Sequence, residues 1–273
     1  MTELLNNPFI QSAAVPFFVS LVVGVLLRPL GWVWMGLSAV LGFIATVYLL
    51  TGFDFFPLRS DRKILLMGAG AVIVGLLLDL LPWRRIMPGL LFVAAAAATV
   101  WLLWPRYRYL EGVELWALFI GGAVYTGWLV AASAGFRSKP LQADSAVFAL
   151  ALGTGLSTLL GATALYGQLA SAIAAAVGAR LLMQILGKPL VAGSVMVVPL
   201  VLVCGLLGVG AIAYAKLPWH SLLLLAVIPL LVRVPLPASL PRLAQLGLTL
   251  VLAAVPAALA VYLTWRETGA PLI

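Results

Sequence analysis

The chain has 273 residues, of which 64% are hydrophobic and only 9% are charged. Soluble domains carry about 25% charged residues, so this composition excludes a soluble globular fold and indicates an all-α integral membrane protein. The formal net charge of +8 comes from Lys and Arg scattered between apolar runs, which favours contact with anionic lipid headgroups and argues against nucleic acid as a partner.

Ten apolar segments predict ten transmembrane helices, because most are close to the roughly 20 residues that cross a bilayer as a helix. The loops between them are short, so we expect a single compact membrane domain without a soluble domain. The ninth segment is short and contains Pro229, so we expect it to be tilted, broken or re-entrant. In chain order the segments are Ile10–Leu27, Trp32–Thr51, Ile64–Leu81, Ile86–Trp104, Val113–Ala134, Ala143–Tyr166, Gln168–Leu186, Leu190–Tyr214, Trp219–Val232 and Leu243–Trp265.

The turns between the segments recur at a spacing of 136 residues, half of the chain. Leu81-Pro82-Trp83 corresponds to Leu217-Pro218-Trp219, and Pro105-Arg106 to Pro241-Arg242. The same shift places the first five segments on the last five within a few residues. Because five is an odd number, the second copy must cross the membrane in the opposite sense, which predicts a five-plus-five inverted-topology repeat. The alternative is that such turns recur by chance between membrane helices.

The two predicted halves, 1–136 and 137–273, leave both termini on one side of the membrane. Nine Lys and Arg residues lie in or near the odd-numbered loops, and seven lie in the even-numbered loops and near the termini. The positive-inside rule therefore favours termini outside the cytoplasm, in a membrane of the bacterial inner-membrane type. The basic loop around Arg59, Arg62 and Lys63 argues against this orientation.

Asp79 and Arg180 are charged residues within apolar segments, where ionisable groups are costly and are candidates for functional positions. Asp79 lies near the end of the third segment and Arg180 near the end of the seventh. These segments run in the same direction, so the two side chains are expected at similar depths. We therefore predict an Asp79–Arg180 ion pair, direct or through one water, that joins the halves as a gate or as a strut. Alternatively, Asp79 reaches the interface or pairs with Arg84, and Arg180 snorkels to the interface.

Three further polar residues are candidates for the lining of a cavity. Gln184 lies one helical turn after Arg180, and Glu111 and Glu114 lie three residues apart on one helix face. Paired carboxylates are typical of acid–base chemistry. The alternative for the two glutamates is the acidic start of an ordinary helix, where carboxylates are favourable.

Three prolines lie well inside apolar segments of the second half. Pro199, Pro229 and Pro256 each remove one backbone donor from a helix. Broken helices mark binding sites in transporters, so the three prolines are candidate helix breaks, and simple kinks are the alternative.

A ridge of small residues, Gly153, Ser157 and Gly161, recurs every four positions in the sixth segment. Such ridges allow membrane helices to approach closely. We expect this ridge to pack within the chain, in a homodimer or against another membrane subunit.

No catalytic motif is visible in the sequence. The single cysteine, Cys204, and the single histidine, His220, exclude a site built from several Cys or His ligands, and we expect neither a metal nor a cofactor.

Polar groups within the segments are few, so any solute is expected to be small, apolar or lipid-like. The favoured function is a non-enzymatic, secondary-transporter-like carrier or exporter. An accessory subunit of a larger membrane complex is the main alternative, and an integral membrane enzyme is the third.

Overall fold

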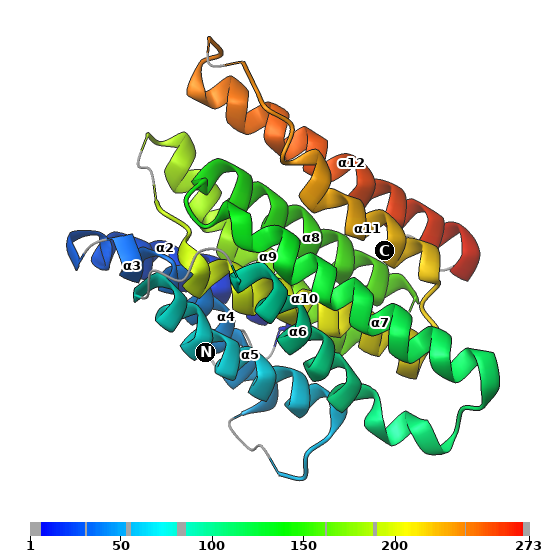
Figure 1. Cartoon of the computed structure of the whole chain (residues 1–273). Helices are drawn as coiled ribbons and strands as arrows, with labels where there is room; N and C mark the ends of the chain where they lie inside the picture. Colours follow the sequence, from blue (N-terminus) through cyan, green and yellow to red (C-terminus); the bar gives the residue numbers. More distant parts are fainter. Residues whose placement is uncertain are drawn as a thin grey trace.

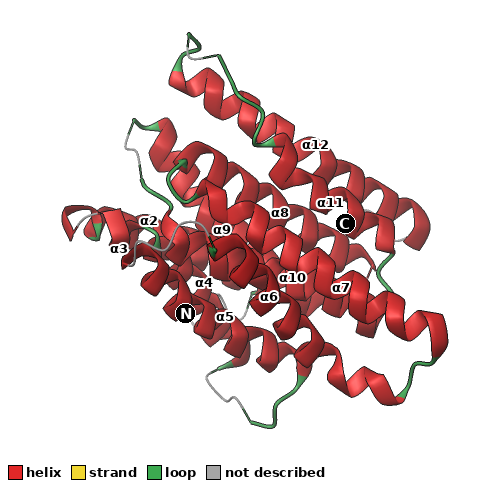
Figure 2. Ribbon diagram, viewed as in Figure 1, coloured by secondary structure: helices red, strands yellow, loops and turns green. Residues whose placement is uncertain are grey.

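The computed structural model describes residues 7–30, 32–52, 56–80, 86–161, 163–187, 190–237 and 239–269, and these form helices and connecting loops (Figures 1 and 2). Ten helical segments follow one another in this part of the chain, in agreement with the hydropathy pattern. The first consists of η1 (Ile10–Ala14) and α2 (Val15–Leu26), and the second of α3 (Trp32–Met35) and α4 (Leu37–Thr51). The others are α5 (Ser60–Leu80), α6 (Met87–Leu103), α7 (Gly112–Ser133), α8 (Pro140–Gly161), α9 (Ala164–Ile185), α10 (Gly193–Ala215), α11 (Trp219–Leu231) and α12 (Arg242–Thr268).

Within the described ranges, seven helices, α5 to α10 and α12, are long and apolar enough to cross a membrane, so the protein is a polytopic helical membrane protein. The shorter apolar helices are Ile10–Leu26, Leu37–Thr51 and Trp219–Leu231. At 1.5 Å per residue they extend about 20 to 26 Å, less than the ~30 Å of bilayer hydrocarbon. The ninth segment is therefore short, as predicted.

The turn at Leu81-Pro82-Trp83, one half of the predicted repeat signature, lies outside the described residues.

The helices α5 and α10 run antiparallel to each other. In α5, Gly68 faces Val203 of α10, and Gly75 faces Val195, so residue numbers rise in one helix as they fall in the other. In contrast, α8 and α12 run parallel, since Gly153 faces Ala257 and Gly161 faces Thr264 in the same order.

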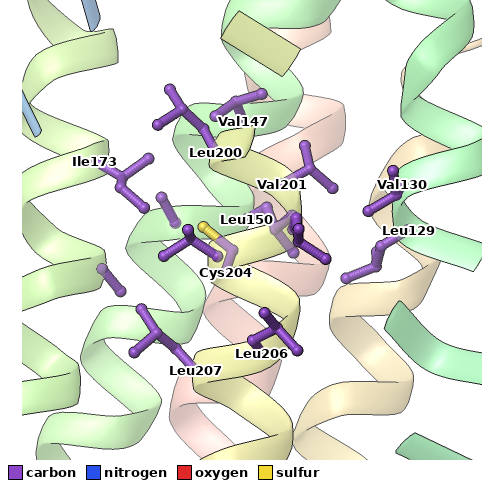
Figure 3. Close-up of a cluster of buried hydrophobic side chains, with 14 of the residues drawn as sticks. Leu129, Val130, Val147, Leu150, Ile173, Leu200, Val201, Cys204, Leu206 and Leu207 are labelled. Atoms are coloured by element: carbon purple, nitrogen blue, oxygen red, sulfur yellow. The ribbon is translucent and has the colours of Figure 1, made fainter. Parts of the chain in front are cut away.

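The helix at the centre of the bundle is α10, which is buried along almost its whole length. It packs against α5, α7 and α8. Figure 3 shows its free thiol, Cys204, surrounded by side chains such as Leu150 of α8 and Ile173 of α9. In a bilayer such packing stabilises the bundle through van der Waals contact, because lipid chains are as apolar as leucine.

Two helix pairs approach closely at small residues near the middle of the bundle. A Cβ atom on Gly68 would lie 2.7 Å from Val203 Cγ2, where α5 meets α10. A Cβ atom on Gly42 would lie 3.1 Å from Ala176 Cβ, where α4 meets α9. The facing residues are 135 and 134 positions apart in the chain, close to the 136-residue spacing of the turns.

Candidate functional site

Arg180 lies near the end of α9 with no exposed surface, which excludes the alternative that it snorkels to the membrane interface. Its Nε donates a hydrogen bond to Asp144 Oδ1 in α8 at 3.0 Å, within an ion pair between two fully buried side chains. A charge-assisted contact of this kind offsets part of the desolvation of both groups. Arg180 and Asp144 are therefore the charged centre of the site.

The other N–H groups of Arg180 donate hydrogen bonds to oxygen atoms from two distant parts of the chain. Nη1 donates to Met35 O at 2.7 Å and to Ser38 Oγ at 3.2 Å. Nη2 donates to Leu190 O at 3.4 Å and to Val191 O at 3.1 Å. An arginine has five N–H donors, and the geometry gives each of them an acceptor. Arg180 therefore joins the start of α4 to the segment that leads into α10.

Gln184 was predicted to line a cavity, and it lies instead within this cluster, one helical turn after Arg180. Its Nε2 donates to Asp144 Oδ2 and, at 3.3 Å, to Pro140 O. Its Oε1 is buried and has no hydrogen-bond partner within the described part of the chain. Gln184 thus binds the second carboxylate oxygen of Asp144 and does not line an open cavity.

The predicted Asp79–Arg180 ion pair is wrong. Asp79 Oδ1 accepts a hydrogen bond from the backbone N–H of Ser194 at 2.8 Å, and Oδ2 accepts one from Val195 at 3.0 Å. Both N–H groups belong to the first turn of α10, where the helix dipole is positive and the amides lack helical acceptors. They satisfy the carboxylate without a guanidinium, while Arg180 has a nearer carboxylate in Asp144. The alternative partner Arg84 lies outside the described residues.

Asp79 and Arg180 nevertheless hold the same short segment, Leu190–Val195, which we name the α10 entry segment. Arg180 binds its first two carbonyl groups and Asp79 its last two amides, while Gly193 N donates to Arg137 O at 3.1 Å. Gly193 has φ +68°, a conformation that favours glycine.

Two further glycines allow the neighbouring helices to approach the entry segment. A Cβ atom on Gly36 would lie 2.3 Å from Ala192 O, and one on Gly75 would lie 2.7 Å from Ser194 O. Both clashes are with backbone atoms, which cannot rotate away. The entry segment is therefore held from three sides by polar contacts and close packing.

The other end of α10 carries the opposite charge. Arg106 Nε donates to Ala213 O at 2.8 Å, and the guanidinium lies over the Tyr214 ring at 5.3 Å from its centroid. Tyr214 OH in turn donates to Leu102 O at 3.0 Å. A carboxylate at the start of a helix and a cation at its end both complement the macrodipole. Asp79 and Arg106 both belong to the first half, so that half caps the central helix of the second.

Glu111 and Glu114 do not join this cluster. Both are exposed at the start of α7, where Glu111 is the N-cap residue and Glu114 lies in the first turn. They are near the Arg106 end of α10, whereas Gln184 is near the opposite end. Their position agrees with the alternative of an acidic helix start.

The three candidate helix breaks are also corrected. Pro199 in α10, Pro229 in α11 and Pro256 in α12 each lie within a continuous helix. A single missing N–H is tolerated in membrane helices when neighbouring groups satisfy the freed carbonyl. Pro199 does line a small apolar cavity of about 130 Å³ between α4, α5 and α10.

The small-residue ridge packs within the chain. A Cβ atom on Gly153 would lie 2.6 Å from Leu225 Cδ2 of α11, and one on Gly161 would lie 2.9 Å from Thr264 Cγ2 of α12. Ser157 is fully buried between them. The ridge thus fits α8 against α11 and α12, as the intrachain alternative expects.

Asp144 is the residue that the sequence interpretation missed. It lies one turn into α8, where an acidic residue is ordinary because it complements the helix dipole. One signal was available. Asp144 lies 17 residues before the end of α8 at Gly161, and Arg180 lies 16 residues after the start of α9 at Ala164. In an antiparallel hairpin, residues equally far from the turn lie at the same depth.

Among the described residues, no group of three His, Cys, Asp or Glu residues could hold a metal ion. Comparison with protein families finds no family model that matches the chain. Comparison with curated proteins likewise finds no match.

Proposed function

We propose that this protein is a non-enzymatic, secondary-transporter-like carrier or exporter of a small, apolar or lipid-like solute, built from two inverted five-helix halves. The helix packing supports this arrangement. The pair α2–α4 in the first half corresponds to α8–α9 in the second, and α6–α7 corresponds to α11–α12. The fifth helices differ, because α12 packs extensively on α8 whereas α7 packs on α10, with no comparable contact to α2 among the described residues.

The observation that carries the proposal is the register of the two central contacts. When two halves are related by a two-fold axis, a residue near the axis faces its own equivalent in the other half. The repeat spacing is 136, and Gly68 faces Val203 while Gly42 faces Ala176, at separations of 135 and 134. In an antiparallel pair the separation of facing residues changes by two for each residue, and here it comes close to 136 near the middle of each helix, where a two-fold relation requires it. Inverted repeats of this kind place the solute site beside the axis.

The chemistry beside this axis suits an apolar solute. The cavity of about 130 Å³ next to the α5–α10 contact is lined by apolar side chains, including Val40, Phe43, Leu65 and Val203. Apolar walls bind apolar groups by removing their surface from water. On this proposal the Arg180 cluster is the gate, since it joins the two halves at one end of α10.

An accessory subunit of a larger membrane complex is the second candidate. It is favoured by the dense packing around α10 and by broad apolar faces on the outer helices. Ile73 of α5, Val93 of α6 and Trp116 of α7 are each more than 60% exposed. Such faces contact either lipid or a partner helix.

Cysteine accessibility separates the two candidates. In a Cys204→Ala background, Val40→Cys places a single thiol at the cavity. Val147→Cys places a single thiol on α8, in the packed interior of the bundle. A carrier opens its cavity to water during each cycle, so a maleimide should modify Val40→Cys at least tenfold faster than Val147→Cys in native membranes. A water-soluble, impermeant maleimide should react from one membrane side at a time.

Equal, slow modification of both thiols would contradict the carrier and favour the subunit. Gel filtration of each purified variant verifies that both fold. Val40 and Val147 are both almost fully buried, so differences in static exposure cannot produce the expected result.

A further inference from the structure

An open, positively charged cavity of about 570 Å³ lies where α8 and α12 begin. Lys139 and Arg242 are exposed on its wall, which also contains the half-buried Gln142 and Gln245, and no carboxylate of the described residues lines it. Neither cation forms an ion pair among the described residues. Because α8 and α12 are parallel, both also present their positive N-terminal ends here. The cavity therefore favours an anionic group at the level of the lipid headgroups.

A second, apolar cavity of about 510 Å³ continues along the same two helices. Its walls include Phe148 and Leu156 of α8 and Leu250 and Trp265 of α12. Both cavities are lined by α8 and α12, and the apolar one begins further along the same two helices, so we name the two together the α8–α12 groove. From Leu250 to Trp265 the groove extends about 22 Å along α12, at 1.5 Å per residue.

We propose that this α8–α12 groove binds one molecule of an anionic phospholipid. The phosphate lies between Lys139 and Arg242, and one hydrocarbon chain lies along the apolar part. The charge of the first cavity selects an anionic headgroup, and the length of the second exceeds the ~15 Å of one bilayer leaflet. This inference does not depend on the carrier function, because a bound lipid would occupy the groove equally in a carrier or in an accessory subunit.

The headgroup part of the proposal is tested with a charge-neutral double variant. The purified full-length protein is titrated with a fluorescent phosphatidylglycerol, and the number of bound lipids is measured by native mass spectrometry. Each juxtamembrane cation contributes about fivefold to the affinity for an anionic lipid, so Lys139→Gln with Arg242→Gln should weaken binding about 25-fold. Arg28→Gln with Arg59→Gln removes two exposed cations elsewhere and should leave the affinity within twofold.

The hydrocarbon part is tested by filling the groove. Ala254 is exposed on the groove wall, whereas its neighbour Val255 is exposed outside it. Ala254→Trp should abolish stoichiometric lipid binding, and Val255→Trp should retain it. Gel filtration shows whether each variant folds.

Three results would overturn the proposal. Equal affinity for phosphatidylglycerol and phosphatidylcholine would remove the anionic headgroup. Unchanged binding by the Lys139→Gln, Arg242→Gln variant would place the lipid elsewhere. A homodimer, or a complex with a second membrane protein, that is lost in Ala254→Trp but retained in Val255→Trp would make the groove a protein interface.

Discussion

A fully buried guanidinium is tolerated in this bundle because every Arg180 donor has an acceptor. One acceptor is the Asp144 carboxylate, and the others are oxygens of Met35, Ser38, Leu190 and Val191. Paired burial lowers the cost of both charges, while the removal of either partner leaves the other uncompensated. At the scale of single residues, the site is a set of charges that hold backbone in place.

Arg180→Gln should therefore destabilise the protein strongly, by about 3–5 kcal/mol, because Asp144 remains buried without its partner. Adding Asp144→Asn should recover part of this loss, with a coupling of about 0.5–3 kcal/mol. Equilibrium unfolding in mixed detergent micelles measures all three variants. Strictly additive losses would show that the two side chains do not interact.

Asp79→Ala should destabilise α10 by about 2–3 kcal/mol, since two hydrogen bonds to a charged acceptor are lost. The matched control is Glu111→Ala. Glu111 also lies at a helix N-terminus, but its side chain makes no capping hydrogen bond, so this change should stay within about 0.5 kcal/mol. Equal losses in unfolding experiments would argue against the capping role of Asp79.

The sequence identified Asp79 and Arg180 as significant because charges inside apolar segments are rare, and both do hold the α10 entry segment. Their partners were not predictable from charge and depth alone. Asp79 binds backbone amides, which carry no sequence signature. Arg180 binds Asp144, which resembled an ordinary helix start. Depth limits which residues can meet, and the rotation of each helix about its axis decides which do.

At the scale of elements, hydropathy predicted the ten helical segments because a helix is the structure that satisfies its own backbone in hydrocarbon. It could not predict that Pro199, Pro229 and Pro256 leave their helices continuous, since this depends on neighbouring groups.

The close approach of two helices depends on glycines at particular positions. In α5, Gly75 lies against the entry segment and Gly70 has open space around it.

This contrast gives a matched pair of substitutions in one helix. Gly75→Ala should destabilise the protein by about 1–3 kcal/mol, because the new methyl group overlaps Ser194 O. Gly70→Ala meets nothing within 4 Å and should be neutral or stabilising by about 0.5–1 kcal/mol, because alanine favours a helix more than glycine does. Thermal unfolding of the two variants measures the difference. Equal effects would show that α5 does not pack closely on the entry segment.

At the scale of the whole molecule, two five-helix halves meet through α5–α10 and α4–α9, and the first half caps both ends of α10 with Asp79 and Arg106. The 136-residue spacing of short turns predicts an inverted repeat, and this relation between the halves stays a prediction. The spacing could not predict the different positions of α7 and α12, which depend on surface packing. On the proposed function, the two halves cross the membrane in opposite senses. The turn before α7 and the turn before α12 lie at opposite ends of the bundle in Figure 1, which is the arrangement that this proposal expects.

The most direct test measures the membrane side of two positions that are 136 residues apart. Arg108 and Ala244 are both exposed near these two turns. Each is replaced by cysteine separately in a Cys204→Ala background, and an impermeant maleimide is added to sealed membrane vesicles of one orientation. The inverted arrangement predicts that one cysteine reacts at once and the other only after permeabilisation. Reaction of both cysteines from the same side would contradict it.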